Sequence, residues 1–170
     1  VDGNADVSVV DNILTIIPDA DYSGSIGVDV FVSDGEYTDS DSFVLIVNPV
    51  NDAPILSDIQ DQSMDEDSVL DLILLGSDVD DDALTYSAVA DGNADISVID
   101  NVLSIIPITN YNGSISVTVT VSDGQYIDTN SFILTVNPIN DAPILSDIQD
   151  QSVDVTGTTL SITPASDYNG

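Results

Sequence analysis

The sequence predicts an all-β chain built from tandem β-sandwich repeats. Three observations lead to this prediction. Long stretches alternate between apolar residues and Ser, Thr or Asp, which is the period-2 pattern of half-buried strands. Gly, Asn, Asp and Pro separate these stretches at the places where turns are needed. The whole pattern then recurs at a fixed offset, which indicates repeats.

The repeat is long and well preserved. Residues 2–63 align without a gap to residues 91–152, an offset of 89, and 44 of those 62 positions are identical. Seven of the 18 substitutions exchange Val with Ile or Thr with Ser, which preserves strand propensity and core volume. One period has the size of a small sandwich domain. We therefore predict the C-terminal part of a first repeat over 1–52, a complete repeat over 53–141, and a partial or truncated third repeat over 142–170.

The complete repeat contains a series of short strand candidates without any helical pattern. Within 114–121, Ile and Val fall on one face and Ser and Thr on the other. About seven such strands are typical of an immunoglobulin-like sandwich. Tyr111 and Tyr22, each just before a long strand, are either tyrosine corners or ordinary core residues. The predicted strands span 55–62, 68–75, 83–90, 95–99, 102–106, 114–122 and 130–137.

The charge of the chain excludes several functions. It has 31 acidic residues and no Lys, Arg or His, so its formal net charge is −31. Hydrophobic residues make up 42% of the chain, which is enough to build a core. A folded chain with this unbalanced charge needs a cation, high salt or wide spacing of its charges along a fibre to limit repulsion. Nucleic acid and anionic membrane surfaces are bound through Lys and Arg, which are absent. No apolar run approaches the roughly 18 residues needed for membrane insertion.

Catalysis is not expected either. The chain has no His or Cys for a nucleophilic triad. A glycosidase needs two carboxylates across a cleft, but Asp is so abundant here that pairs carry no specific signal. We therefore expect that the chain is not an enzyme.

The two ends of the chain do not complete the repeat. Copy one lacks the strands that would precede Val1, and Val1 is not an initiator methionine. We therefore expect the sequence to be an internal piece of a longer chain. Residues 144–152 open a third copy, yet 160–170 resemble 103–113, and about 32 residues of the repeat are missing between them. Three explanations stay open: a fragment with a divergent third domain, a split domain completed by a neighbouring subunit, or a sequence that is only partly determined.

Acidic residues gather where the sandwich domains are expected to end. They occur in 65–67, in 78–82, in the linkers 48–54 and 137–143, and before Gly at Asp34 and Asp123. Close carboxylates repel one another unless they are protonated or bridged by a hard cation. Ca²⁺ accepts six to eight oxygen ligands, whereas Zn²⁺ favours His or Cys, which are absent. The alternative is that these Asp residues only terminate strands and keep the surface soluble.

These segments resemble the cadherin-like tandem repeats of large bacterial surface proteins and adhesins. SDVDDDALTYS is similar to the acidic segment before a strand in that family, VSDG and VNPVNDAP to its late strands and linker, and DED to its acidic first-strand motif. The resemblance implies Ca²⁺ at interdomain junctions. It implies a first junction of Asn51, Asp52, Asp78, Asp80 and Asp123, with Asp19 and Asp21 as further candidates, and a second of Asp65, Glu66, Asn140 and Asp141.

Departures from the family pattern weaken the second junction. The third copy has Val153, Asp154 and Val155 in place of the DED motif, and it lacks the acidic segment before a strand. We therefore expect this junction to bind Ca²⁺ weakly or in a different manner.

The resemblance implies a structural or adhesive segment of an extracellular filament or cell-surface adhesin. Its expected partners are neighbouring repeats or identical subunits in a fibre. The alternative is a module that binds a surface glycan or protein, for which Tyr37 and Tyr126 are the best candidates because they follow Gly in loops. The chain also holds one N-glycosylation sequon, at 112–114, in a predicted turn.

Overall fold

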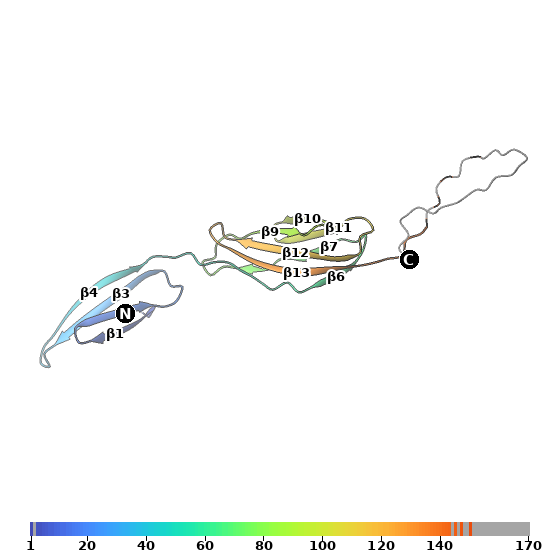
Figure 1. The fold of residues 1–170 in the computed structure, drawn as a ribbon. Helices are drawn as coiled ribbons and strands as arrows, with labels where there is room; N and C mark the ends of the chain where they lie inside the picture. The colour runs from blue at the N-terminus through green and yellow to red at the C-terminus, as the bar shows by residue number, and fades with distance from the viewer. Residues whose placement is uncertain (2, 144, 146, 148–149, 151–170) are drawn as a thin grey trace, which may run out of the picture. The chain divides into compact units, whose positions relative to one another are not determined.

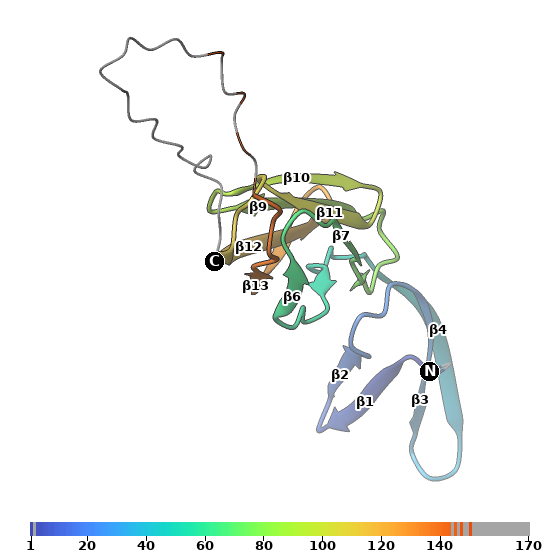
Figure 2. The same ribbon diagram turned by 90° about the vertical axis from the view of Figure 1, so that its right-hand side faces the viewer.

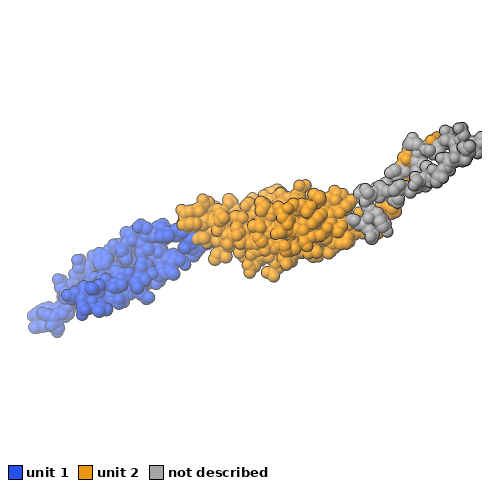
Figure 3. All heavy atoms as spheres, in the orientation of Figure 1, with its two compact units in different colours: residues 1–52, 78–82 blue, residues 53–77, 83–170 orange. Residues whose placement is uncertain are grey.

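The computed structural model describes residues 1, 3–143, 145, 147 and 150, which form strands and turns (Figure 1). No helix occurs among these residues, so none of them forms a helix that could span a membrane. The predicted all-β class is confirmed. The chain divides into two compact units, which Figure 3 colours separately. The first unit holds Val1–Asp52 with Asp78–Asp82, and the second holds the remainder.

The first unit consists of two β-hairpins. Strand β1 (Ala5–Val10) pairs antiparallel with β2 (Ile13–Pro18), and β3 (Gly24–Ser33) pairs antiparallel with β4 (Thr38–Val47). Asp11, in the turn between β1 and β2, has a φ of 54°, a left-handed conformation that Asp tolerates better than most residues.

The second unit is a sandwich of two main sheets. One sheet has the strand order β10-β11-β7, and the other has the order β6-β13-β12-β9 (Figures 1 and 2). A short pair, β5 with β8, completes the unit. The strands are β5 (Ile55–Leu56), β6 (Gln62–Asp65), β7 (Leu70–Ile73), β8 (Gly76–Ser77), β9 (Thr85–Ala90), β10 (Ala94–Ile99), β11 (Val102–Pro107), β12 (Gly113–Ser122) and β13 (Ile127–Asn137).

Alternating side chains from both sheets build the core of the second unit. Buried residues come from β11, β12 and β13, and from Leu56 and Leu74. On β12 the apolar side chains at alternate positions are 0% exposed, whereas the Ser and Thr residues between them lie on the outer face. The period-2 interpretation of this segment is therefore confirmed. The buried residues of β12 are Ile115, Val117, Val119 and Val121.

The predicted strand 55–62 is wrong, because the structure divides it into β5 and β6. Between them the chain crosses from the short β5–β8 pair to the edge of β13, where β6 pairs in parallel. Side-chain carboxylates replace part of the sheet hydrogen bonding across this crossing. The Leu56 N–H donates to Asp128 Oδ2 at 2.9 Å, and the Ile133 N–H donates to Asp61 Oδ1 at 2.7 Å.

The two tyrosines before the long strands act as local corners. The Tyr111 hydroxyl donates to the Ser114 carbonyl at 2.9 Å, and Tyr22 makes the same bond to Ser25. Gly113 has a φ of 140°, and a Cβ at this position would lie 2.9 Å from the Tyr111 hydroxyl oxygen. The close approach of the tyrosine therefore requires glycine here. Tyr111 also packs against the core, so it combines both roles that the sequence left open.

The two copies of one phenylalanine offer a matched test of this packing. Phe132 is 2% exposed, whereas its repeat equivalent Phe43 is 46% exposed. We predict that Phe132→Ala destabilises the second unit by about 3–5 kcal/mol. Phe43→Ala should cost about 1 kcal/mol because little burial is lost. Urea unfolding followed by circular dichroism and hydrogen exchange measures both, and equal effects would contradict the difference in packing.

Candidate cation sites

Carboxylates at the hairpin turns are held by backbone N–H groups. Asp123 Oδ1 accepts from the N–H groups of Gln125 and Tyr126, both at 2.6 Å. Asp34 makes the equivalent bonds to Glu36 and Tyr37. The bond from Tyr37, followed by that from Glu36, lowers the pKa of the Asp34 carboxyl below its ordinary value. The structure thus places the predicted ligand Asp123 in a turn of the second unit, where it holds the β12–β13 connection.

Glu66 is a buried carboxylate of the second unit. Its side chain is only 1% exposed, directly after β6. The Ile139 N–H donates to Glu66 Oε1 at 2.6 Å, and the Glu66 N–H donates to the Asn137 carbonyl at 2.9 Å. These bonds attach the turn after β6 to the linker after β13. Burying a carboxylate is costly unless its oxygens are paired, so the remaining oxygen needs a partner.

The other predicted residues of the second junction surround this linker. The Asn137 side-chain amide donates to Asp65 Oδ1 at 3.4 Å, and the Asn140 amide donates to the Asp141 carbonyl at 3.1 Å. Asp141 Oδ2 is buried, as is Glu66 Oε2, and neither has a hydrogen-bond partner within the described part of the chain. All four predicted residues thus belong to two adjoining segments of one unit.

The predicted residues of the first junction, apart from Asp123, lie in the first unit. The Asp52 N–H donates to Asp80 Oδ2 at 2.8 Å, and the Asp80 N–H donates to Asp78 Oδ1 at 2.9 Å. Asn51 donates from its side-chain amide to the Asp52 carbonyl at 2.8 Å. The second oxygen of Asp78 is buried and, like the two in the second unit, has no hydrogen-bond partner among the residues described.

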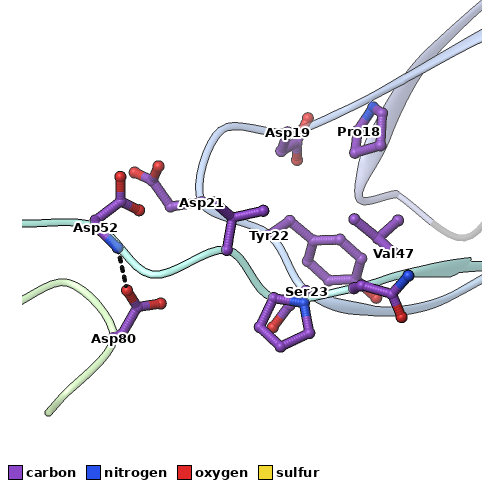
Figure 4. Close-up of a pocket in the computed structure, with 11 residues that line it drawn as sticks. Pro18, Asp19, Asp21, Tyr22, Ser23, Val47, Asp52 and Asp80 are labelled. Carbon is purple, nitrogen blue, oxygen red and sulfur yellow. Dashed lines mark hydrogen bonds between the residues drawn. The ribbon is translucent and has the colours of Figure 1, made fainter. Parts of the chain in front are cut away.

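Asp52 and Asp80 border a hollow of about 270 Å³ that Asp19 and Asp21 also line (Figure 4). Tyr22, Pro18 and the linker before Asp52 form the rest of its wall. The four carboxylates come from the turn after β2, the linker after β4 and the loop 78–82. The second repeat has Ile108 and Asn110 in place of Asp19 and Asp21, so this acidic hollow is specific to the first copy.

The two acidic regions differ from a preformed metal centre. In the described residues, no three acidic side chains come close enough to hold a metal ion by themselves. A Ca²⁺ ion would therefore need main-chain carbonyls, Asn oxygens and water in its shell, all of which are ordinary calcium ligands. The Ca²⁺ sites stay a prediction.

Sequence reasoning missed the residues that hold Glu66 in place. Asn137 and Ile139 bind Glu66 through backbone groups, which carry no signal of their own in a sequence. The sequence offered one clue, which is that Asn137 and Ile139 both belong to the linker 137–143 identified from the repeat.

Comparisons with known proteins place the second unit in a family. A family model of the bacterial Ig domain matches residues 51–137. No curated protein sequence is significantly similar to the chain. Similar solved structures include Drosophila N-cadherin EC1-4 (16% identity, 99% of this chain and 48% of that chain, TM-score 0.47) and the human desmocollin-1 ectodomain (13%, 98% and 37%, TM-score 0.43).

An endo-fucoidan hydrolase of glycoside hydrolase family 107 is also similar, with 16% identity over 81% of this chain and a TM-score of 0.40. The chain spans 23% of the length of that hydrolase. At these identities the likeness concerns the fold alone.

The lowered pKa of Asp34 predicts a pH dependence for the β3–β4 turn. A carboxyl with a depressed folded-state pKa adds stability above its unfolded pKa, and this stability is lost as the pH falls through the folded value. We expect the protection of the Glu36 and Tyr37 amides against exchange, relative to the intrinsic exchange rate at each pH, to fall on acidification. Asp34→Asn should remove this dependence. An NMR titration in which Asp34 titrates at or above 3.8 would contradict the assignment.

Proposed function

The chain belongs to the bacterial Ig domain family, and from that premise we propose that it is a structural and adhesive repeat segment of an extracellular filament or cell-surface adhesin. Domains of this family are typically surface-exposed and non-enzymatic. The second unit is compatible with this role, because its two sheets enclose a core of their own. The finer part of the proposal is that Ca²⁺ rigidifies the interdomain junctions.

The observation that carries the calcium proposal is the set of buried carboxylate oxygens without partners. Glu66 Oε2, Asp78 Oδ2 and Asp141 Oδ2 share this property in the described part of the chain. No Lys, Arg or His exists to neutralise them. A buried, unpaired charge costs several kcal/mol, so a bound cation offers large stabilisation at these points.

Calcium at these positions would fix segments that otherwise meet through a few hydrogen bonds. In the second unit an ion on Glu66 and Asp141 would tie the turn after β6 to the linker after β13. In the first unit an ion near Asp52 and Asp80 would tie the linker after β4 to the loop 78–82. Both linkers then lose hinge freedom, which is what an extended array of repeats requires.

The alternative function is a surface module that binds a glycan or a protein. One observation favours it: Tyr37 and Tyr126 are 71% and 48% exposed at equivalent hairpin turns. Exposed tyrosines can stack on sugar rings and supply a hydroxyl. A glycan array probed with the unchanged chain and with the Tyr37→Ala variant tests this. Equal glycan binding by the two would show that Tyr37 does not form a binding site.

We predict saturable Ca²⁺ binding in titration calorimetry. Glu66→Gln keeps the shape of the side chain and the acceptor for Ile139, but it removes the charge that attracts the ion. It should weaken binding at the second site by about tenfold or more, since the charge count of the ligands sets calcium affinity. Asp80→Asn should do the same for the first site.

Asp11→Asn is the matched control, because it removes one negative charge from an exposed turn away from both sites. It should leave both affinities nearly unchanged. If Glu66→Gln, Asp80→Asn and Asp11→Asn bind Ca²⁺ alike, the ion is held by the overall charge and the site assignment is wrong.

A further inference from the structure

Strand β9 is an unprotected edge of the second unit. Its two main sheets, ordered β10-β11-β7 and β6-β13-β12-β9, end in the edge strands β10, β7, β6 and β9. Three of these, β6, β7 and β10, each carry an aspartate, and a charge on an edge strand discourages pairing with another chain. Strand β9 has the sequence TYSAVA, with no charge and no proline, and it pairs with β12 without a bulge. Its edge is therefore open to an added strand.

The free edge of β9 presents the backbone groups of Tyr86, Ala88 and Ala90. The Asp91 N–H donates to the Ser116 carbonyl at 3.1 Å, which fixes the phase of the antiparallel ladder between β9 and β12. Alternate residues face β12 from there, and the backbone groups of the residues between them point away from the sheet. The side chains of these outward-facing residues pack against the core, so the backbone that they present is held in an extended form.

A hollow of about 430 Å³ adjoins this edge at the start of β9. Its lining comes from β9, from β10 and from the turn between β10 and β11. Strands β9 and β10 contact each other although they are edge strands of opposite sheets (Figures 1 and 2). The hollow thus lies at the side of the sandwich where the edges of the two sheets meet. The residues that line it are Leu84, Thr85, Tyr86, Val98, Asp100 and Asn101.

The lining of the hollow combines apolar side chains with one carboxylate. Leu84, Tyr86 and Val98 are partly buried and also pack against the core. Asn101 is fixed in place because its side-chain amide donates to the Leu74 carbonyl at 3.1 Å. Asp100 is exposed. An apolar surface next to an exposed carboxylate suits a side chain with an aliphatic stem and a cationic head, which is Lys or Arg.

We propose that the edge of β9 and the hollow beside it bind an extended segment of another protein that carries a Lys or Arg. The segment adds a strand antiparallel to β9, and its residue opposite Tyr86 lies on the same face as Tyr86 and reaches the hollow. A second copy of this chain cannot supply that residue, because the chain has no Lys or Arg and Asp100 repels its carboxylates. This binding site goes beyond the proposed structural role and does not depend on Ca²⁺.

The capped peptide acetyl-Val-Thr-Val-Thr-Lys-Thr-amide tests the proposal with the full chain. In the antiparallel register its two Val residues lie opposite Ala90 and Ala88, and its Lys lies opposite Tyr86 at the hollow. We expect a saturable shift of these three amides in an NMR titration, together with slower hydrogen exchange. The amides of Ser87 and Val89 face β12 already, so their exchange should change little.

Methylation of the peptide backbone isolates the main-chain hydrogen bonds. N-methylation of the second Val removes the N–H that faces the Ala88 carbonyl, and it should abolish detectable binding. N-methylation of the Thr that follows changes an N–H that points away from β9, so it should have little effect. Ala88→Pro removes the same contact from the protein and should also abolish binding, with folding checked by circular dichroism. The methylated peptides decide the question if that variant does not fold.

A charge substitution tests the hollow. Asp100→Asn should weaken binding of the Lys peptide about two- to fivefold, the range expected for an exposed ion pair. The same variant should bind a peptide with norleucine in place of Lys as the unchanged chain does. Asp11→Asn is the matched control, because Asp11 is the repeat equivalent of Asp100, has the same φ of 54° and belongs to the other unit.

Equal binding of the two N-methylated peptides would overturn strand addition at β9. Equal effects of Asp100→Asn and Asp11→Asn, or equal binding of peptides with Lys and with Glu in the fifth position, would overturn the role of the hollow. If sedimentation shows that the chain alone is a dimer in which the amides of Tyr86, Ala88 and Ala90 are already protected, a second copy occupies the edge and the proposal is wrong.

Discussion

The structure depends on one electrostatic constraint, which is that no basic side chain exists to pair with 31 acidic ones. Each carboxylate must find backbone N–H groups, polar side chains, water or a cation. The fold meets this constraint mainly with backbone donors. Asp61 and Asp128 replace missing sheet hydrogen bonds between β5 and β6, and Asp34 and Asp123 hold hairpin turns. Carboxylates thus help to connect the strands. The carboxylate oxygens that backbone donors leave unpaired lie at the ends of the units.

The two repeat copies show how this constraint shapes the chain locally. They share turn carboxylates and core residues, yet they differ at a few polar positions. The first copy has Asp19, Asp21 and Asp41, where the second has Ile108, Asn110 and Asn130. The first two add charge to a hollow beside Asp52 and Asp80, and the third stands in place of the amide with which Asn130 donates to Asp58 in the second unit. The fold tolerates these changes because none lies in the core.

The sequence was enough to predict the class and most strands, because burial on one side of a strand forces the alternation seen along β12. It was not enough to predict the break between Leu56 and Gln62, because the side chains that hold this crossing come from residues more than 70 positions away in the sequence. The sequence also did not show that the Asp123 carboxylate accepts a backbone N–H in the β12–β13 turn, because such bonds become apparent only in the folded turn. The burial of Glu66 also depends on a linker 73 residues away. Contacts over such separations are set by the tertiary fold, which periodicity does not encode.

The central claim is that specific carboxylates, and not the total charge, bind the cation. Thermal unfolding of the chain in CaCl₂ and in NaCl at matched ionic strength tests this most directly, because general screening depends on ionic strength while site binding stabilises by mass action. The account predicts a higher melting temperature in CaCl₂ that saturates with concentration. Equal melting temperatures in the two salts would contradict it.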